Sequence, residues 1–170
     1  MTQEDKELLI RDLCARLPYG VKCKIENSEI YNEKLFDKSI VGKLNGIFNN
    51  SIFIGETTIL QTDKIEKLKP YLRPMSSMTE EDLRNFAVLK FKNNDIWEIN
   101  GFPEMKFGFK GFINIQCRNK NSGDTSIYQV NTRTPLETYW GIDWLNAHHF
   151  DYRGLIEKGL ALEAPDEMYN

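Results

Sequence analysis

The sequence contains few of the residues that most often bind metals or form covalent intermediates, with three cysteines and two histidines among 170 residues. The cysteines, Cys14, Cys23 and Cys117, are widely separated and form no CxxC pair. Zinc ribbons and thioredoxin-like redox chemistry are therefore disfavoured. An odd number of dispersed cysteines predicts free thiols in a reducing, cytoplasmic setting.

The sequence also lacks a long apolar run and a large excess of either charge. No window approaches about 18 consecutive apolar residues, so we expect no membrane span. Residues 1–17 are charged from Glu4 onward and lack the apolar core of a secretory signal. A net charge of −3 and a pI near 5.5 exclude a strongly basic domain that coats nucleic acid by charge alone. The length and the 41% hydrophobic content are sufficient for a buried core.

The first half predicts a helix followed by short strands. Thr2 can cap a helix that carries an apolar stripe and stops at Pro18. Residues 21–26 alternate apolar and charged side chains, which predicts a half-buried strand with a basic outer face. Strands at 39–44 and 47–54 follow, with Asn45-Gly46 as their predicted turn. Asn49-Asn50 is a second possible turn that splits the later strand, and shorter strands lie near 29–35 and 58–61. Residues 64–69 fit either a helical turn or a last strand. We expect an α+β protein in which residues 1–74 form a helix on a small, bent SH3-like or Sm-like barrel; an open meander is the alternative.

The second half predicts a further α+β region over residues 75–170, packed against the first. Thr79 and the acidic residues after it start a short helix. Antiparallel strands are predicted at 88–91, 96–99, 105–117 and 126–131. Thr134 opens a capping box, and the helix that it starts should run to about residue 149 and bury Trp140 and Trp144. Gly154 and Gly159 break the segment that follows into a short turn and a strand at 160–163.

Three blocks of sequence resemble a known family. They are LCARLPYGVK at 13–22, IEKLKPYLRPMSSMTEE at 65–81 and IDWLNAHHFDYRGLIEKGLALEAP at 142–165. The family consists of small uncharacterised proteins encoded by gut Bacteroidales genomes, prophages and mobile elements. The resemblance implies a phage or mobile-element origin and no particular chemistry. It also implies that the strand-rich residues near 88–131 are an elaboration in this chain.

His148, His149 and Asp151 are the candidates for catalysis. One histidine could act as a base that Asp151 orients. Adjacent helical residues point about 100° apart, so both rings cannot easily bind one metal ion. No metal or cofactor is therefore expected. The alternative is that these residues end a helix, where histidine favourably meets the last carbonyls.

A basic and aromatic strand face is the candidate for nucleic-acid binding. Lys106, Lys110 and Phe112 share one face of the predicted strand, and Arg118 follows. Cations interleaved with aromatics can bind single-stranded nucleic acid, although lysines also protect sheet edges and protein-binding surfaces share this pattern. The leading hypothesis is a non-enzymatic accessory protein that binds an unknown host or phage protein. Single-stranded nucleic-acid binding and an enzyme centred on the histidines are the alternatives.

Overall fold

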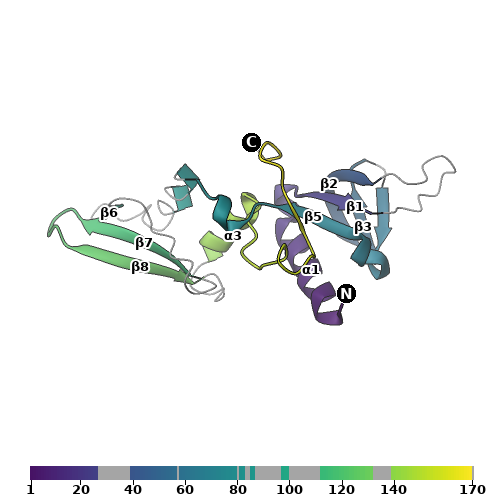
Figure 1. Cartoon of the computed structure of the whole chain (residues 1–170), viewed down its shortest axis with the longest axis horizontal. Helices are drawn as coiled ribbons and strands as arrows, with labels where there is room; N and C mark the ends of the chain where they lie inside the picture. Colours follow the sequence, from purple (N-terminus) through teal and green to yellow (C-terminus); the bar gives the residue numbers. More distant parts are fainter. Residues whose placement is uncertain are drawn as a thin grey trace. The chain divides into compact units, whose positions relative to one another are not determined.

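The computed structural model describes residues 1–26, 39–56, 58–79, 81–82, 85–86, 97–99, 112–131 and 139–169. The chain divides into two compact units (Figure 1), Met1–Pro74 with Asn146–Asn170, and Met75–Leu145. Both helices and sheets are present, so the chain is an α+β protein. The sequence predicted that residues 75–170 would stay together, whereas the C-terminal segment returns to the first unit. The reason is burial, because Leu155 and Leu160 belong to the core of that unit.

The first unit begins with helix α1 (Gln3–Arg16). The Thr2 hydroxyl accepts the backbone N–H of Asp5, and the Asp5 carboxylate accepts the N–H of Thr2. This reciprocal cap satisfies two free N–H groups at the start of the helix. A 3-10 turn, η1 (Leu17–Tyr19), follows, and Gly20 adopts a left-handed conformation with φ +69° that redirects the chain into the sheet.

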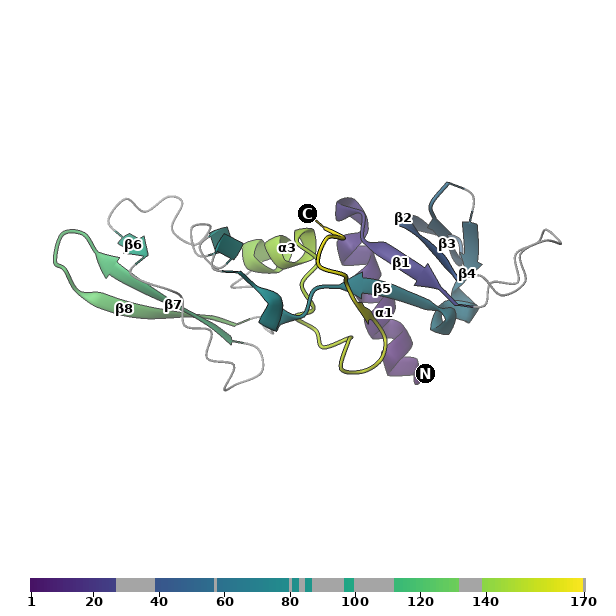
Figure 2. The same cartoon turned by 45° about the horizontal axis from the view of Figure 1, so that its top comes forward.

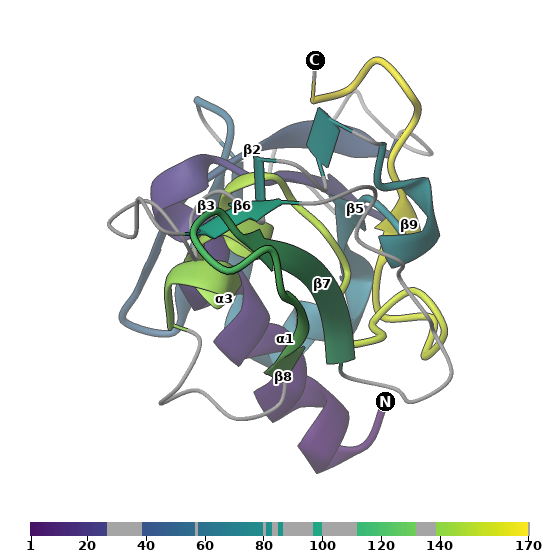
Figure 3. The same ribbon diagram turned by 90° about the vertical axis from the view of Figure 1, so that its left-hand side faces the viewer.

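The main sheet has the order β4-β3-β2-β1-β5-β9. Its strands are β1 (Lys22–Ile25), β2 (Ile40–Phe48), β3 (Ser51–Ile54), β4 (Thr58–Gln61), β5 (Leu68–Leu72) and β9 (Leu162–Glu163). All pairings are antiparallel except β5 with β9, which lie side by side in Figure 3. Among the described strands β4 and β9 are the two edges, so no closed barrel forms. The 3-10 segment η2 (Thr62–Lys67) connects β4 to β5.

The predicted turn at Asn45-Gly46 is wrong. These residues lie within β2, where the register with β3 shifts between Leu44 and Gly46. The turn occurs at Asn49 and Asn50, the second turn that the sequence suggested, whose φ angles of +46° and +61° suit a tight hairpin. The Asn45 side-chain amide donates to the backbone carbonyl of Gly55 at 2.6 Å. A bulge therefore occupies the position where the sequence suggested a reversal.

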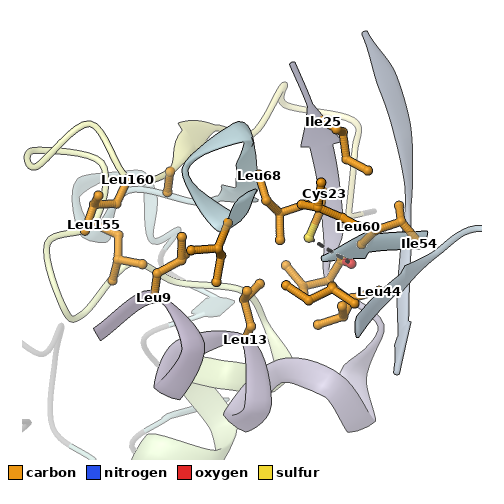
Figure 4. Close-up of a cluster of buried hydrophobic side chains, with 14 of the residues drawn as sticks. Leu9, Leu13, Cys23, Ile25, Leu44, Ile54, Leu60, Leu68, Leu155 and Leu160 are labelled. Atoms are coloured by element: carbon orange, nitrogen blue, oxygen red, sulfur yellow. Dashed lines mark hydrogen bonds between the residues drawn. The ribbon is translucent and has the colours of Figure 1, made fainter. Parts of the chain in front are cut away.

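The core of the first unit lies on one face of this sheet. Leu9 and Leu13 of α1 contact it from the helix side (Figure 4). Figure 2 shows α1 running past β1 and β5. Buried and exposed side chains alternate along these strands, as expected for strands with one buried face. Helix α1 and the later segments cover the buried side chains. They include Cys23, Ile25, Leu44, Ile52, Ile54, Leu60 and Leu68.

The second unit contains η3 (Met75–Ser77), a sheet of order β6-β7-β8 and helix α3 (Tyr139–Ala147) as far as Leu145. The strands are β6 (Trp97–Ile99), β7 (Phe112–Asn119) and β8 (Thr125–Asn131), all antiparallel. The Trp144 ring meets the edge of Phe86 at a centroid distance of 5.3 Å. Tyr139 is 76% exposed. The strands predicted at 29–35 and 88–91 and the first part of 105–117 lie outside the described residues.

Candidate functional site

A buried ionic cluster joins α1 to the C-terminal segment. Asp12 and Arg16 lie one turn apart on α1 and both are fully buried. The Arg16 Nε–H donates to Asp12 Oδ2 at 2.7 Å, and an Arg16 terminal N–H donates to the Phe150 carbonyl at 2.8 Å. Arg153 donates to the other Asp12 oxygen at 2.7 Å. Each oxygen of Asp12 therefore accepts from a different arginine, so this cluster holds the segment around Phe150 against α1.

His149 lies just after α3 in a left-handed conformation with φ +60°. Its ring packs against the Tyr169 ring at 3.9 Å, and its Nδ1 is buried without a hydrogen-bond partner. Burial, assisted by nearby Arg16, lowers the pKa of His149 to about 4. The imidazole is therefore neutral at pH 7. His148 is only partly buried.

Asp151 is used by the backbone. Its two carboxylate oxygens accept the N–H groups of Leu155 and Ile156, each at 2.8 Å. Burial raises the pKa of Asp151, and these two hydrogen bonds oppose the rise. Asp151 thus caps the turn that follows it, while His149 packs on Tyr169. In the part of the chain that the structure describes, no three His, Cys, Asp or Glu side chains gather as a metal site.

The predicted nucleic-acid residues are described only in part. Lys106 and Lys110 lie outside the described residues. Phe112 begins β7, with its backbone opposite Asn131. Arg118 is exposed near the end of β7, and its guanidinium lies close to Gly123. Binding at these residues stays a prediction.

An apolar outer face covers β2, β3 and β4 on the side away from the core. We define it by Phe48, Phe53 and Ile59. Phe53 stands opposite Gly46 on β2 and Ile59 on β4. Phe48 is 67% exposed and Ile59 is 56% exposed. The sequence predicted that Phe53 and Ile52 point to opposite faces of their strand. It did not identify this apolar outer face, because the three side chains come together only through the register of the strands.

The free edge of β4 lies beside this apolar face. Thr62 N–H donates to the Asn50 carbonyl at 2.9 Å, in the same register as the β3–β4 pairs. In an antiparallel ladder hydrogen-bonded and non-hydrogen-bonded pairs alternate. Leu60 therefore bonds β3, and the backbone N–H and C=O groups of Ile59 and Gln61 point away from it. Within the described residues these groups have no strand partner.

A lysine face covers β2, β1 and β5 on the same outer side of the sheet. We define it by Lys22, Lys24, Lys43 and Lys69. Lys22 stands opposite Lys43, and Lys24 stands opposite Lys69. The alternation in residues 21–26 predicted the outward direction of Lys22 and Lys24. It could not supply their partners, which come from strands distant in sequence.

The comparisons with known proteins give no identification. Neither protein-family models, nor curated proteins, nor solved structures yield a match to this chain. Within the described residues, no helix has the length and apolar character to cross a bilayer. The surfaces described above are therefore the basis for proposing a function.

Proposed function

We propose that this chain is a non-enzymatic, cytoplasmic accessory protein of phage or mobile-element origin that acts by binding a protein partner. The observation that carries the proposal is the edge of β4. This strand, Thr58–Gln61, contains no charge, no proline and no bulge. Charges, prolines and bulges are among the devices by which proteins prevent an edge from pairing with another chain.

The partner segment should be extended and should add a strand to β4. The N–H and C=O groups of Ile59 and Gln61 supply its backbone hydrogen bonds. Ile59 and Phe53 supply an apolar surface for alternate side chains of the bound segment. Backbone bonds then give affinity and the apolar contacts give specificity, as in other cases of strand addition.

The same reasoning relates the sheet to the SH3-like barrel expected from sequence. Three features are those of an opened form of that barrel. They are the preceding helix, the strand order β4-β3-β2-β1-β5 and the 3-10 segment between β4 and β5. We infer an SH3-like meander in which β9 extends the side of β5 and leaves β4 as the free edge.

The proposal is tested by removing one backbone donor from the free edge. Gln61 has φ −74°, which proline adopts without strain, and its N–H faces away from β3. Gln61→Pro should therefore leave the fold intact and block strand addition. Gln61→Ala is the matched control, because it removes the side chain and keeps the donor.

The tagged protein is used to capture partners from nuclease-treated lysate of a host-type bacterium. A protein that is retained by wild type and Gln61→Ala but lost by Gln61→Pro and Ile59→Lys supports the proposal. Tyr139→Lys controls for a charge placed on an exposed aromatic elsewhere. A partner retained equally by Gln61→Pro contradicts it. Self-association that Gln61→Pro abolishes also contradicts it, because the edge would then bind a second copy.

A further inference from the structure

The lysine face places like charges opposite each other twice in one sheet. The pairs Lys22–Lys43 and Lys24–Lys69 each lie directly across neighbouring strands. Like charges in that position destabilise a sheet. Among the described residues, Glu26 provides the carboxylate that approaches this face, at 4.0 Å from Lys24 and 3.9 Å from Lys69. The face thus carries four positive charges, two of them beside Glu26, in a protein whose net charge is −3.

Edge protection does not explain these lysines. Lysine commonly blunts exposed edge strands. Here, however, β1 is paired on both sides, with β2 and with β5, and it carries two of the four lysines. An anionic ligand would relieve the repulsion that remains within the face.

The other two lysine side chains, Lys22 and Lys43, lie against the backbone. Lys22 Nζ donates to the Met168 carbonyl at 3.0 Å, and it lies 6.0 Å from the centroid of the Tyr169 ring. The Lys43 side chain passes over Gly20, where a Cβ atom would fall 2.1 Å from Lys43 Cε. Glycine at that position leaves room for the lysine, so the side chain is held close to the sheet.

We propose that the lysine face binds the phosphate backbone of a single-stranded nucleic acid. Strands lie about 4.8 Å apart, and alternate residues of one strand lie about 6.7 Å apart, which gives a regular grid of positive charge. The cations of the face are lysines, and a lysine ammonium binds phosphate as a point charge. Tyr71 is half-buried on the same side of β5 as Lys69, and it is the aromatic side chain on which we expect a base to stack. This site is separate from the free edge of β4 and does not depend on the function proposed above.

The test is the salt dependence of binding to a fluorescent oligo-dT of about 20 nucleotides, measured by anisotropy. Single-stranded binding weakens with a log–log slope of about −0.7 per neutralised phosphate. Four lysine contacts therefore predict a slope of about −2.8, or about 50-fold weaker binding between 50 and 200 mM salt. The variant Lys24→Gln/Lys43→Gln should reduce the slope to about −1.4, because two contacts remain. This variant removes one charge from each like-charged pair, so its fold should be retained.

Controls separate this site from general charge effects. Lys64→Gln/Lys158→Gln changes the net charge equally at exposed positions elsewhere and should leave the slope unchanged. Tyr71→Leu should weaken oligo-dT binding about five-fold or more by removing a stacking surface. Absence of binding at 50 mM salt, or an equal loss in the control variant, overturns the proposal. Equal or tighter binding of a polyglutamate peptide, with no effect of Tyr71→Leu, also overturns it in favour of an acidic protein partner.

Discussion

Removal of Asp12 should destabilise the first unit more than any surface substitution. Asp12 neutralises the fully buried Arg16 and also accepts from Arg153. In Asp12→Ala, Arg16 keeps its bond to the Phe150 carbonyl but loses its counter-charge. Removing one partner of a buried ion pair costs about 3–5 kcal/mol, because the remaining charge stays out of water. We expect a loss of that size in the free energy of unfolding.

Two further variants separate the buried charge from its hydrogen bonds. Arg153→Ala leaves Asp12 paired with Arg16, so it should cost only about 1.5–3 kcal/mol, the value of one charge-assisted hydrogen bond. Asp12→Leu/Arg16→Met removes both buried charges, and such apolar replacements are often neutral or stabilising. The double variant should therefore be more stable than Asp12→Ala. An exposed pair, Lys158 with Asp5 at 3.8 Å, is the control, and Lys158→Ala should cost less than about 1 kcal/mol.

The assay must report on the first unit alone, and all three tryptophans belong to the second. Cys23 is fully buried in the first unit, and burial raises the pKa of its thiol to about 12. It should therefore react with an alkylating reagent only after that unit opens. Pulsed alkylation across a urea gradient, with the Cys23 peptide quantified by mass spectrometry, gives the midpoint for each variant. A cost below about 1 kcal/mol for Asp12→Ala, or a double variant as unstable as Asp12→Ala, would refute the reasoning.

Three other predictions use the same alkylation assay. The pKa of His149 is lowered to about 4 in the folded state, so the unfolded state binds the proton more tightly. The free energy of unfolding should therefore fall by up to about 3 kcal/mol as the pH drops from 6.5 to 4. His149→Asn should remove this dependence, because asparagine tolerates the positive φ of this position. Asp151→Ala should cost about 1–2 kcal/mol through loss of a cap for two backbone N–H groups, and Asp151→Asn should cost less; equal costs would contradict the capping role. Lys43→Gln should leave stability unchanged or raise it by a few tenths of a kcal/mol, because it relieves repulsion with Lys22, and a loss above about 1 kcal/mol would argue against that repulsion.

Local patterns predicted the elements whose signals lie within a few residues. The cap at Thr2, the strand beginning near Val21 and the alternation of Ile52, Phe53 and Ile54 all depend on neighbouring residues, and the structure confirms them. Asn45-Gly46 misled because the dipeptide suits a bulge as well as a turn. A short strand was predicted at 160–163, where β9 forms, but two residues leave no periodicity that could identify its parallel pairing with β5.

The candidate surfaces required contacts between distant parts of the sequence. The bond from Arg153 to Asp12 spans 141 positions, and no spacing rule connects them. In the same way, Lys22 was expected to face outward, but the charge opposite it depends on the register of β2. Sequence reasoning therefore identified single residues with an outward direction, whereas the pairs that define a binding surface came from the pairing of strands.

The two proposed surfaces lie on the outer side of one sheet, and β2 contributes to both. Lys43 in its first half belongs to the lysine face, and Phe48 at its end belongs to the apolar outer face. Since the bulge after Leu44 separates them, a change in one face should not alter the other. Gln61→Pro should then leave the salt slope for oligo-dT unchanged, and Lys24→Gln/Lys43→Gln should retain the captured protein. If both variants instead lose both ligands, the surfaces are one site, and the captured protein reaches the chain through nucleic acid.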